Sequence, residues 1–183
     1  MIKRIAITGP ESTGKSMLTR QLADHYRSAW VPEYAREYID NLDRPYVESD
    51  ILEIARGQAK LEKMGSTSLR KEATLGKVQQ RDRFLFCDTE ALVTKIWSDV
   101  KFGRCDPWIL DLLETHVYDL YLLCDIDIPW EYDPQREHPE MRVQLFNLYY
   151  EELLERHRNF RVVSGLGEDR LENAINFIDS CFT

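Results

Sequence analysis

The chain has 183 residues, of which 43% are hydrophobic and 31% are charged, and its formal net charge is −8 at pH 7. This composition is typical of a single globular domain and excludes a disordered or fibrous chain. The acidic balance argues against a nucleic-acid partner, because a surface that holds a phosphate backbone has to be basic. No apolar run approaches the roughly 18 residues that span a bilayer, so we expect no membrane partner either.

Short apolar runs alternate with helical patterns along the chain. Residues 28–35 (SAWVPEYA) are a weak strand candidate, and four runs are typical of buried parallel strands, namely 4–9 (RIAITG), 84–88 (FLFCD), 119–125 (DLYLLCD) and 160–165 (FRVVSG). Helical patterns separate these runs. The sequence therefore predicts one three-layer α/β domain over residues 1–183, with a parallel sheet of about five strands and helices on both faces.

The first strand leads into GPESTGKS, residues 9–16, which satisfies the phosphate-loop (P-loop) pattern G-x-x-x-x-G-K-[ST]. The backbone N–H groups of such a loop and the N-terminus of the next helix bind phosphates. Lys15 would reach the β- and γ-phosphates, and Ser16 would ligate Mg²⁺. An ordinary glycine-containing turn is the alternative. We predict that ATP is bound by Gly9, Glu11, Ser12, Thr13, Gly14, Lys15, Ser16 and Met17.

The strand FLFCD ends in an acidic residue, Asp88. P-loop enzymes place such a residue near Mg²⁺ from the end of a second strand, so we predict a metal-binding or catalytic role for Asp88. A helix N-cap is the alternative, because Asp and Thr both favour that position. The two roles are compatible if Thr89 caps the helix.

Charged and aromatic residues cluster in WVPEYAREY, residues 30–38. Glu33 and Arg36 are predicted to face the substrate at the mouth of the sheet, and Tyr34, or alternatively Tyr38, is predicted to stack on it. The alternatives are a solvated helix start for the charged residues and a core position for the tyrosine.

Two segments fall outside the α/β alternation. Residues 64–82 are polar and poorly periodic, so we expect a surface excursion there. Residues 129–140 (PWEYDPQREHPE) carry three prolines and many charges, which favours a lid at about 129–142. Its arginines, Arg136 and Arg142, would neutralise a phosphoryl group in transfer while the lid excludes water. An exposed side chain and a solvated salt bridge are the alternatives.

The last strand ends in Ser164 and Gly165, which are predicted to contact the adenine ring, with a plain strand-to-helix turn as the alternative. Trp130 lies beside the predicted lid, where its ring could stack on a flat substrate. The four cysteines form no C-x-x-C pair, and the four histidines have no metal-ligand spacing. We interpret the cysteines as reduced thiols and expect a cytoplasmic protein without a signal peptide.

These motifs resemble the ribosylnicotinamide kinase domain of the bifunctional NAD-biosynthesis regulator of bacteria, within the P-loop kinases and AAA-type ATPases. The matching segments are GPESTGKS, VPEYAREYI, IARGQAKLE, FCDTEALVTKIW and YDLYLLCDIDIPWEYDPQR, in the expected order over nearly the whole chain. The resemblance implies that Gln58, Trp130 and Asp133 join the substrate site. One departure is WEYDPQR, where family members often carry an Asp-Asp-Gly-like stretch before the lid arginine. The adenylyltransferase and DNA-binding parts have no counterpart, so a kinase module alone is implied.

The implied activity is ATP-dependent, Mg²⁺-assisted phosphorylation of a ribose hydroxyl, above all conversion of nicotinamide riboside to nicotinamide mononucleotide in NAD salvage. Asp88, or alternatively Glu33, would accept the hydroxyl proton, and an aromatic face would attract the positive pyridinium ring. Lys15, Asp88, Arg136 and Arg142 form the predicted catalytic set. Another nucleoside acceptor and a nucleotide-dependent regulatory ATPase are the alternatives, and no oligomeric state is predicted.

Overall fold

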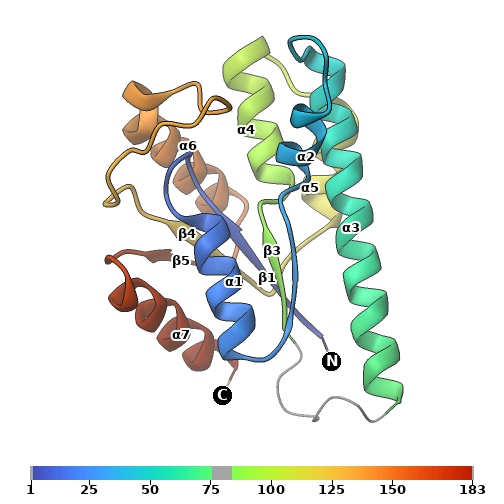
Figure 1. The fold of residues 1–183 in the computed structure, drawn as a ribbon, viewed down its shortest axis with the longest axis vertical. Coiled ribbons are helices and arrows are strands. Elements are labelled where there is room, and N and C mark those ends of the chain that lie inside the picture. The colour runs from blue at the N-terminus through green and yellow to red at the C-terminus, as the bar shows by residue number, and fades with distance from the viewer. Residues whose placement is uncertain (1, 76–83, 183) are drawn as a thin grey trace.

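Five parallel strands form one sheet in the computed structural model, which describes residues 2–75 and 84–182. The strand order is β2-β3-β1-β4-β5 (Figure 1). The strands are β1 (Lys3–Thr8), β2 (Ala29–Val31), β3 (Phe84–Asp88), β4 (Leu120–Cys124) and β5 (Phe160–Val163). All five predicted strands are confirmed, including the weak candidate at β2.

Helices cover both faces of the sheet. They are α1 (Lys15–His25), α2 (Tyr34–Asp40), α3 (Glu48–Thr74), α4 (Ala91–Phe102), α5 (Pro107–Thr115), α6 (Arg142–Glu155) and α7 (Glu168–Phe182), with a 3-10 helix, η1, at Pro139–Met141. Ile5 and Ile7 of β1 pack in the core layer of α1 and α7, while Ala6 packs in the layer of α3, α4 and α6. This alternation follows from the two-residue period of a strand, and it gives the predicted three layers.

Helix α3 extends through most of the segment predicted to be a surface excursion. The prediction for residues 64–82 is wrong as far as Thr74, where the helix ends. Gly65 lets the helix approach the sheet, because a β-carbon there would lie 3.2 Å from side-chain atoms of Leu85 and Val31. Leu69, one turn later, is buried. The remainder of the predicted excursion, from residue 76, lies outside the described residues.

The sheet places the phosphate loop beside the end of β3. Strand β1 pairs with β3 in parallel, and Ile7 lies opposite Asp88. Parallel strands end at the same edge of a sheet, so Asp88 lies level with a residue two positions before Gly9. The candidate site is therefore assembled at the carboxyl edge of the central strands, where α/β proteins bind ligands.

Gly57 in α3 provides a test of close packing. A β-carbon on Gly57 would lie 2.0 Å from Cε1 of Tyr34, whereas one on Gly65 would meet no atom closer than 3.2 Å. Replacing glycine with alanine in a helix interior normally stabilises it by about 1 kcal/mol. We expect Gly57→Ala to lower the free energy of unfolding by about 1–3 kcal/mol, because the Tyr34 ring has to move.

Urea denaturation would measure the effect, with Gly65→Ala as the matched control that stays within about 1 kcal/mol of the wild type. Equal stabilities of the two variants would contradict the packing of Tyr34 on Gly57.

Candidate active site

The phosphate loop is already folded around a concave backbone. Gly9 and Gly14 have φ angles of 128° and 73°, in the region that favours glycine. A side chain at Gly9 would also meet the carbonyl oxygen of Cys124 at 3.0 Å. Lys15 begins α1, and its ammonium group donates to the carbonyl oxygen of Pro10 at 2.7 Å. The lysine is thus held over the loop where a phosphate would bind.

Asp88 lies buried next to this loop, and its surroundings fit a magnesium ligand. Burial raises the pKa of Asp88 to about 6, and the charge of Glu33 adds to this, while Ser16, Lys15 and Arg20 act in the opposite direction. Its Oδ1 atom is buried without a hydrogen-bond partner among the residues that the structure describes. An unpaired buried carboxylate oxygen beside a serine hydroxyl is a donor set that Mg²⁺ prefers.

Magnesium would need further oxygen ligands from outside the protein. Within residues 2–75 and 84–182, no group of three or more His, Cys, Asp or Glu side chains is placed to hold a metal ion. Mg²⁺ commonly takes one or two protein ligands and completes its shell with waters and substrate phosphates. Ser16 and Asp88 fit that mode of binding.

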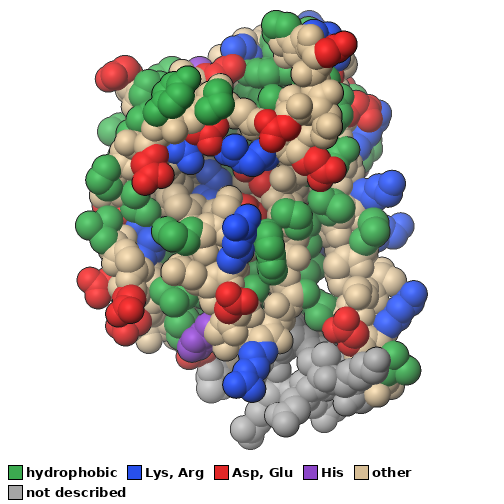
Figure 2. Space-filling view, in the orientation of Figure 1, with side chains coloured by type: hydrophobic (Ala, Val, Ile, Leu, Met, Phe, Trp, Pro, Cys, Tyr) green, Lys and Arg blue, Asp and Glu red, His purple; other side chains and the backbone are tan. Residues whose placement is uncertain are grey.

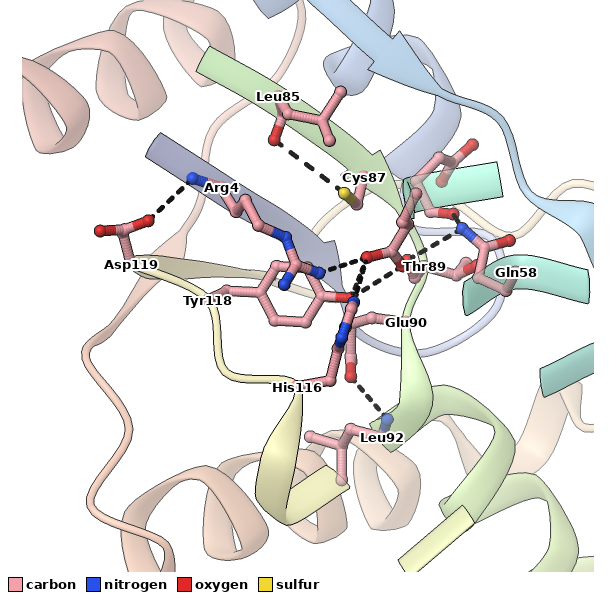
Figure 3. Close-up of polar contacts among 12 residues, drawn as sticks. Arg4, Gln58, Leu85, Cys87, Thr89, Glu90, Leu92, His116, Tyr118 and Asp119 are labelled. Atoms are coloured by element: carbon pink, nitrogen blue, oxygen red, sulfur yellow. Dashed lines mark hydrogen bonds and ion pairs between the residues drawn. The ribbon is translucent and has the colours of Figure 1, made fainter. Parts of the chain in front are cut away.

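The N-cap of α4 is neither Asp88 nor Thr89, which the sequence offered for that position. Glu90 is the N-cap, and its carboxylate accepts from the amide of Leu92 (Figure 3). It also accepts from the hydroxyl of Thr8. Thr89 has a φ of 68° and donates its N–H to the carbonyl of Ile7. Asp88 is therefore not used as a cap, which leaves its carboxylate for the phosphate loop.

A cavity of about 660 Å³ opens along the phosphate loop. One end is lined by residues 9–17, and Figure 2 shows basic side chains in a hollow that acidic side chains surround. The other end is apolar and aromatic, with Ile39, Pro45, Tyr46, Val93, Ile96, Trp97 and Val100. This arrangement suits a ligand with a charged tail at one end and a flat ring at the other.

Sequence reasoning missed the aromatic pair at the far end. The rings of Tyr46 and Trp97 are 5.0 Å apart in an edge-to-face arrangement, and the indole N–H of Trp97 donates to the Tyr46 hydroxyl at 3.0 Å. Tyr46 lies in the loop before α3 and Trp97 lies inside α4. A tryptophan within a helix is typical of a core residue, so only the packing of α3 against α4 identifies this pair.

The predicted substrate residues fall into two groups. Glu33 and Arg36 line the cavity. Tyr34 and Gln58 are absent from its lining: the Tyr34 ring packs on Gly57, and Gln58 is buried and accepts the Tyr34 N–H at 2.9 Å.

The two predicted lid residues also lie outside that lining. Neither Trp130 nor Asp133 lines the cavity. Asp133 instead forms an ion pair with Arg36, with 2.9 Å between Oδ2 and Nη2. A buried amide and a paired carboxylate thus stand where the sequence predicted direct substrate contacts.

The predicted lid is joined to the phosphate loop through Ser12. The Ser12 hydroxyl accepts from the amide of Glu131 at 2.9 Å and from Arg136 Nη1 at 3.3 Å. Arg142 donates to the carbonyl of Ser12 at 3.1 Å and to that of Ile128 at 2.8 Å. Both lid arginines therefore contact the loop, and Arg136 also lines the cavity, whereas Arg142 is absent from its lining.

Glu11 adds a second contact between loop and lid. Its Oε2 atom accepts from the backbone amides of Glu137 and His138, at 3.1 and 3.3 Å. On the far side of the lid, Gln135 donates to Asp40 of α2 at 2.6 Å. These contacts hold the segment predicted to be a lid to the phosphate loop and to α2.

The loop after β5 is occupied by contacts within the protein. The amide of Gly165 donates to Asp127, and the carbonyl of Ser164 accepts from Asn173. The guanidinium of Arg170 donates to Gly165 and, on its other nitrogen, to the carbonyl of Thr13. Neither Ser164 nor Gly165 lines the cavity, and sequence reasoning missed Arg170, which ties this loop to the phosphate loop.

A buried polar cluster lies behind the site (Figure 3). Glu62 of α3 accepts from the hydroxyl of Tyr118 at 2.7 Å, and it bonds to Arg4 and to His116. Burial opposes ionisation of Glu62, but these partners hold its pKa below the ordinary value. Because Arg4 belongs to β1 and Tyr118 precedes β4, the cluster fixes α3 against the centre of the sheet.

Comparison with known proteins places these features in a family. The profile of a family described as an AAA domain matches residues 4–170. The trifunctional NAD biosynthesis/regulator protein NadR of Escherichia coli strain K12, and that of Salmonella typhimurium strain LT2, are each 28% identical to the chain over 141 residues. These matches cover 74% of this chain and 31% of each relative, so the chain spans less than a third of their length. The resemblance to the NAD-biosynthesis regulator is confirmed.

Solved structures share the fold. A crystal structure of NadR protein in complex with NR superimposes with a TM-score of 0.78 at 21% identity, over 98% of this chain and 50% of that one. A deoxyadenosine kinase from M. mycoides gives a TM-score of 0.61 at 14% identity, over 97% and 99% of the two chains. These likenesses confirm the P-loop kinase fold. None of the helices in the described part of the chain has the length and apolar character needed to cross a membrane.

Glu90 gives a prediction about stability and pH. Burial raises the pKa of Glu90 to about 7, above the ordinary value of 4.5. A raised carboxyl pKa means that the folded protein binds the proton more tightly than the unfolded chain. Glu90 therefore contributes stability below pH 4.5, and that contribution is lost as the pH rises through about 7, with a total change of at most about 3 kcal/mol.

We expect Glu90→Gln to remove this dependence, because the amide stays uncharged and keeps an oxygen for the Leu92 N–H. Denaturant titrations at pH 5, 6, 7 and 8 should show the wild type losing stability relative to the variant as the pH rises. Asp88 titrates in the same direction in both proteins, so it cancels in the difference. Parallel curves for the two proteins would contradict the prediction.

Proposed function

The chain belongs to the AAA domain family, and we propose that it is an ATP-dependent kinase that phosphorylates a ribose hydroxyl of a nucleoside. The observation that carries the proposal is the arrangement of one cavity. It has the phosphate loop at one end, an aromatic pair at the other, and a lid that brings Arg136 and Arg142 to the loop. A lid that closes over such a cavity when substrates bind would keep water out and direct the phosphoryl group to the bound acceptor.

The nucleotide binds through its phosphates. Lys15 contacts the β- and γ-phosphates, and the amides of residues 11–17 surround them. Ser16 and Asp88 would hold Mg²⁺, which would supply positive charge to the phosphoryl oxygens. Arg136 and Arg142 add positive charge from the lid, where it matters most in the transition state.

The two carboxylates near the loop have different positions and so different roles. Glu33 lines the cavity, whereas Asp88 is almost fully buried beside Ser16. A proton acceptor has to reach the acceptor hydroxyl, and a metal ligand has to face the phosphates. Glu33 therefore takes the proton as the hydroxyl oxygen bonds to the γ-phosphorus and ADP leaves, while Asp88 binds the metal. The sequence favoured Asp88 over Glu33 as the acceptor of the hydroxyl proton, and this proposal reverses that preference.

Charge pairing at the acceptor end favours a nucleoside over a nucleotide. Arg44 and Arg36 line the cavity, but each is bound to a carboxylate: Arg44 to both oxygens of Asp50 at 2.7 and 2.9 Å, and Arg36 to Asp133. A phosphorylated acceptor would require free basic groups at this end. The paired arginines suit an acceptor without a phosphate.

Nicotinamide riboside is the acceptor that fits best. Its pyridinium ring is a flat cation, which an aromatic face attracts. Tyr46 and Trp97 line the cavity, the ammonium of Lys101 lies 5.3 Å from the centre of the Tyr46 ring, and the Tyr46 hydroxyl donates to the carboxylate of Glu137 at 2.9 Å. NadR proteins, which the chain resembles, are named for NAD biosynthesis, and one solved NadR structure is a complex with NR. The product would be nicotinamide mononucleotide, and the four free cysteines suit the reducing cytoplasm.

The proposal is tested by phosphoryl transfer from γ-labelled ATP in the presence of Mg²⁺. Nicotinamide riboside, cytidine, uridine, adenosine and their deoxy forms would be offered as acceptors, with nicotinamide mononucleotide as a phosphorylated control. We expect labelled nicotinamide mononucleotide as the main product. Transfer to another nucleoside would change the acceptor, and ATP hydrolysis without transfer to any of them would favour the regulatory ATPase.

The division of roles between the carboxylates gives separate mutant effects. Glu33→Gln should lower kcat by about a hundredfold or more and leave the KM for ATP nearly unchanged, because only the proton acceptor is lost. Asp88→Asn should instead raise the Mg²⁺ concentration that gives half-maximal rate. Initial rates over a series of Mg²⁺ concentrations measure both effects. A Glu33→Gln variant with full kcat would contradict this assignment and make Asp88 the proton acceptor.

A further inference from the structure

Gln58 connects the two chain segments that carry Glu33 and Asp88. It lies on α3 and is 5% exposed. Its Oε1 atom accepts from the N–H of Tyr34, the residue after Glu33, at 2.9 Å. Its Nε2 atom faces the carbonyl oxygens of Asp88 and Thr89, at 3.4 and 3.5 Å (Figure 3). One side-chain amide therefore bridges the start of α2 and the end of β3.

Beyond its first turn, α2 is attached through polar pairs, namely Arg36 with Asp133, Tyr38 with Asp50 and Gln135 with Asp40. Helix α2 has seven residues and none of them is buried, so little apolar packing fixes it. Glu33 is the N-cap of α2, but its side chain makes no capping hydrogen bond. The helix start is held instead by the ring of Tyr34 on Gly57 and by the N–H of Tyr34 on Gln58. Both contacts come from one turn of α3.

The other side of the bridge is rigid. Four residues after Gln58, on the same face of α3, Glu62 is bound by Arg4, His116 and Tyr118. This buried cluster fixes the height and rotation of α3 relative to the sheet. A side-chain amide on a fixed helix can hold two loops at a defined separation, which is what a functional site needs from its supporting residues.

We propose that Gln58 is a positioning residue that sets the separation of the Glu33 and Asp88 carboxylates and does not contact the nucleoside. The proposal rests on the proposed function in one respect, namely that these carboxylates act on the acceptor hydroxyl and on the metal. The amide oxygen and nitrogen of Gln58 are both engaged within the protein, and Gln58 is absent from the lining of the 660 Å³ cavity. This positioning role replaces the substrate-binding role that the sequence resemblance implied for Gln58.

The variant Gln58→Met tests the bridge, because methionine has a similar length and cannot form these hydrogen bonds. Lys60→Met, at an exposed position of the same helix, is the matched control. We expect Gln58→Met to lower kcat by about 10- to 100-fold, since a small misplacement of a catalytic group has effects of this size. The KM for the nucleoside and the affinity for Mg-ATP, measured by calorimetry, should change by less than about threefold.

Amide hydrogen exchange provides a measurement that needs no acceptor. In the wild type, the N–H of Tyr34 should be protected, and in Gln58→Met it should exchange at least about tenfold faster. A second variant, Gln58→Glu, keeps an oxygen for the Tyr34 N–H and, at a pH where its carboxylate is ionised, has no donor for the carbonyls of Asp88 and Thr89. It should retain the protection of Tyr34 and still lower kcat. If Gln58→Met does not fold, this variant and the exchange rate in the wild type decide the question.

Two results would overturn the proposal. A tenfold higher KM for the nucleoside with unchanged kcat would make Gln58 a substrate ligand, and unchanged exchange of Tyr34 in Gln58→Met would remove the bridge. Failure of the proposed function appears differently. In that case the wild type transfers no phosphate to any nucleoside, while the exchange of the Tyr34 amide still reports whether the bridge exists.

Discussion

Strands β1 and β3 pair in parallel with Ile7 opposite Asp88, and this register determines how the site is assembled. It aligns the end of β3 with the start of the phosphate loop, so that a buried carboxylate and a lysine from distant parts of the chain meet at one edge. A shift of one residue would turn Asp88 to the other face of the sheet. The register is held by two apolar layers that alternate along β1, with Ile5 and Ile7 on one side and Ala6 on the other.

The pKa values of the buried carboxyl groups near this edge are shifted in two opposite directions. Glu62 has a guanidinium, an imidazole and a phenol as neighbours, and its pKa is held below the ordinary value. Asp88 and Glu90 have fewer donors, and burial raises the pKa of both. The ionised group supports the structure through α3, whereas the unpaired oxygen of Asp88 remains available to a cation. The number of donors around each carboxylate thus separates the supporting group from the candidate ligand.

The fold and the phosphate loop could be predicted from the sequence because their signals are local. Apolar runs identify strands, and the spacing of Gly9, Gly14 and Lys15 identifies the loop. The far end of the cavity could not be predicted, because Tyr46 and Trp97 are 51 positions apart and meet only when α3 packs against α4. The continuation of α3 beyond residue 64 was also not predicted, because the sequence there is polar. Only one glycine and one leucine pack this part of the helix against the sheet. Arg170 was missed for a similar reason: it bonds to backbone carbonyls, which leave no mark in the sequence pattern, and to Asp127, which lies 43 positions away.

The lid contacts explain how the cations can be in place before a nucleotide binds. Lys15 donates to a carbonyl oxygen of Pro10, and Arg136 donates to the hydroxyl of Ser12. Both acceptors are uncharged, and hydrogen bonds to them are weaker than those to a phosphate oxygen. A phosphate bound in the loop would replace these acceptors with stronger ones. Electrostatic stabilisation is most effective when the charges need no reorganisation during the reaction, and the bonds to Pro10 and Ser12 hold Lys15 and Arg136 in that condition.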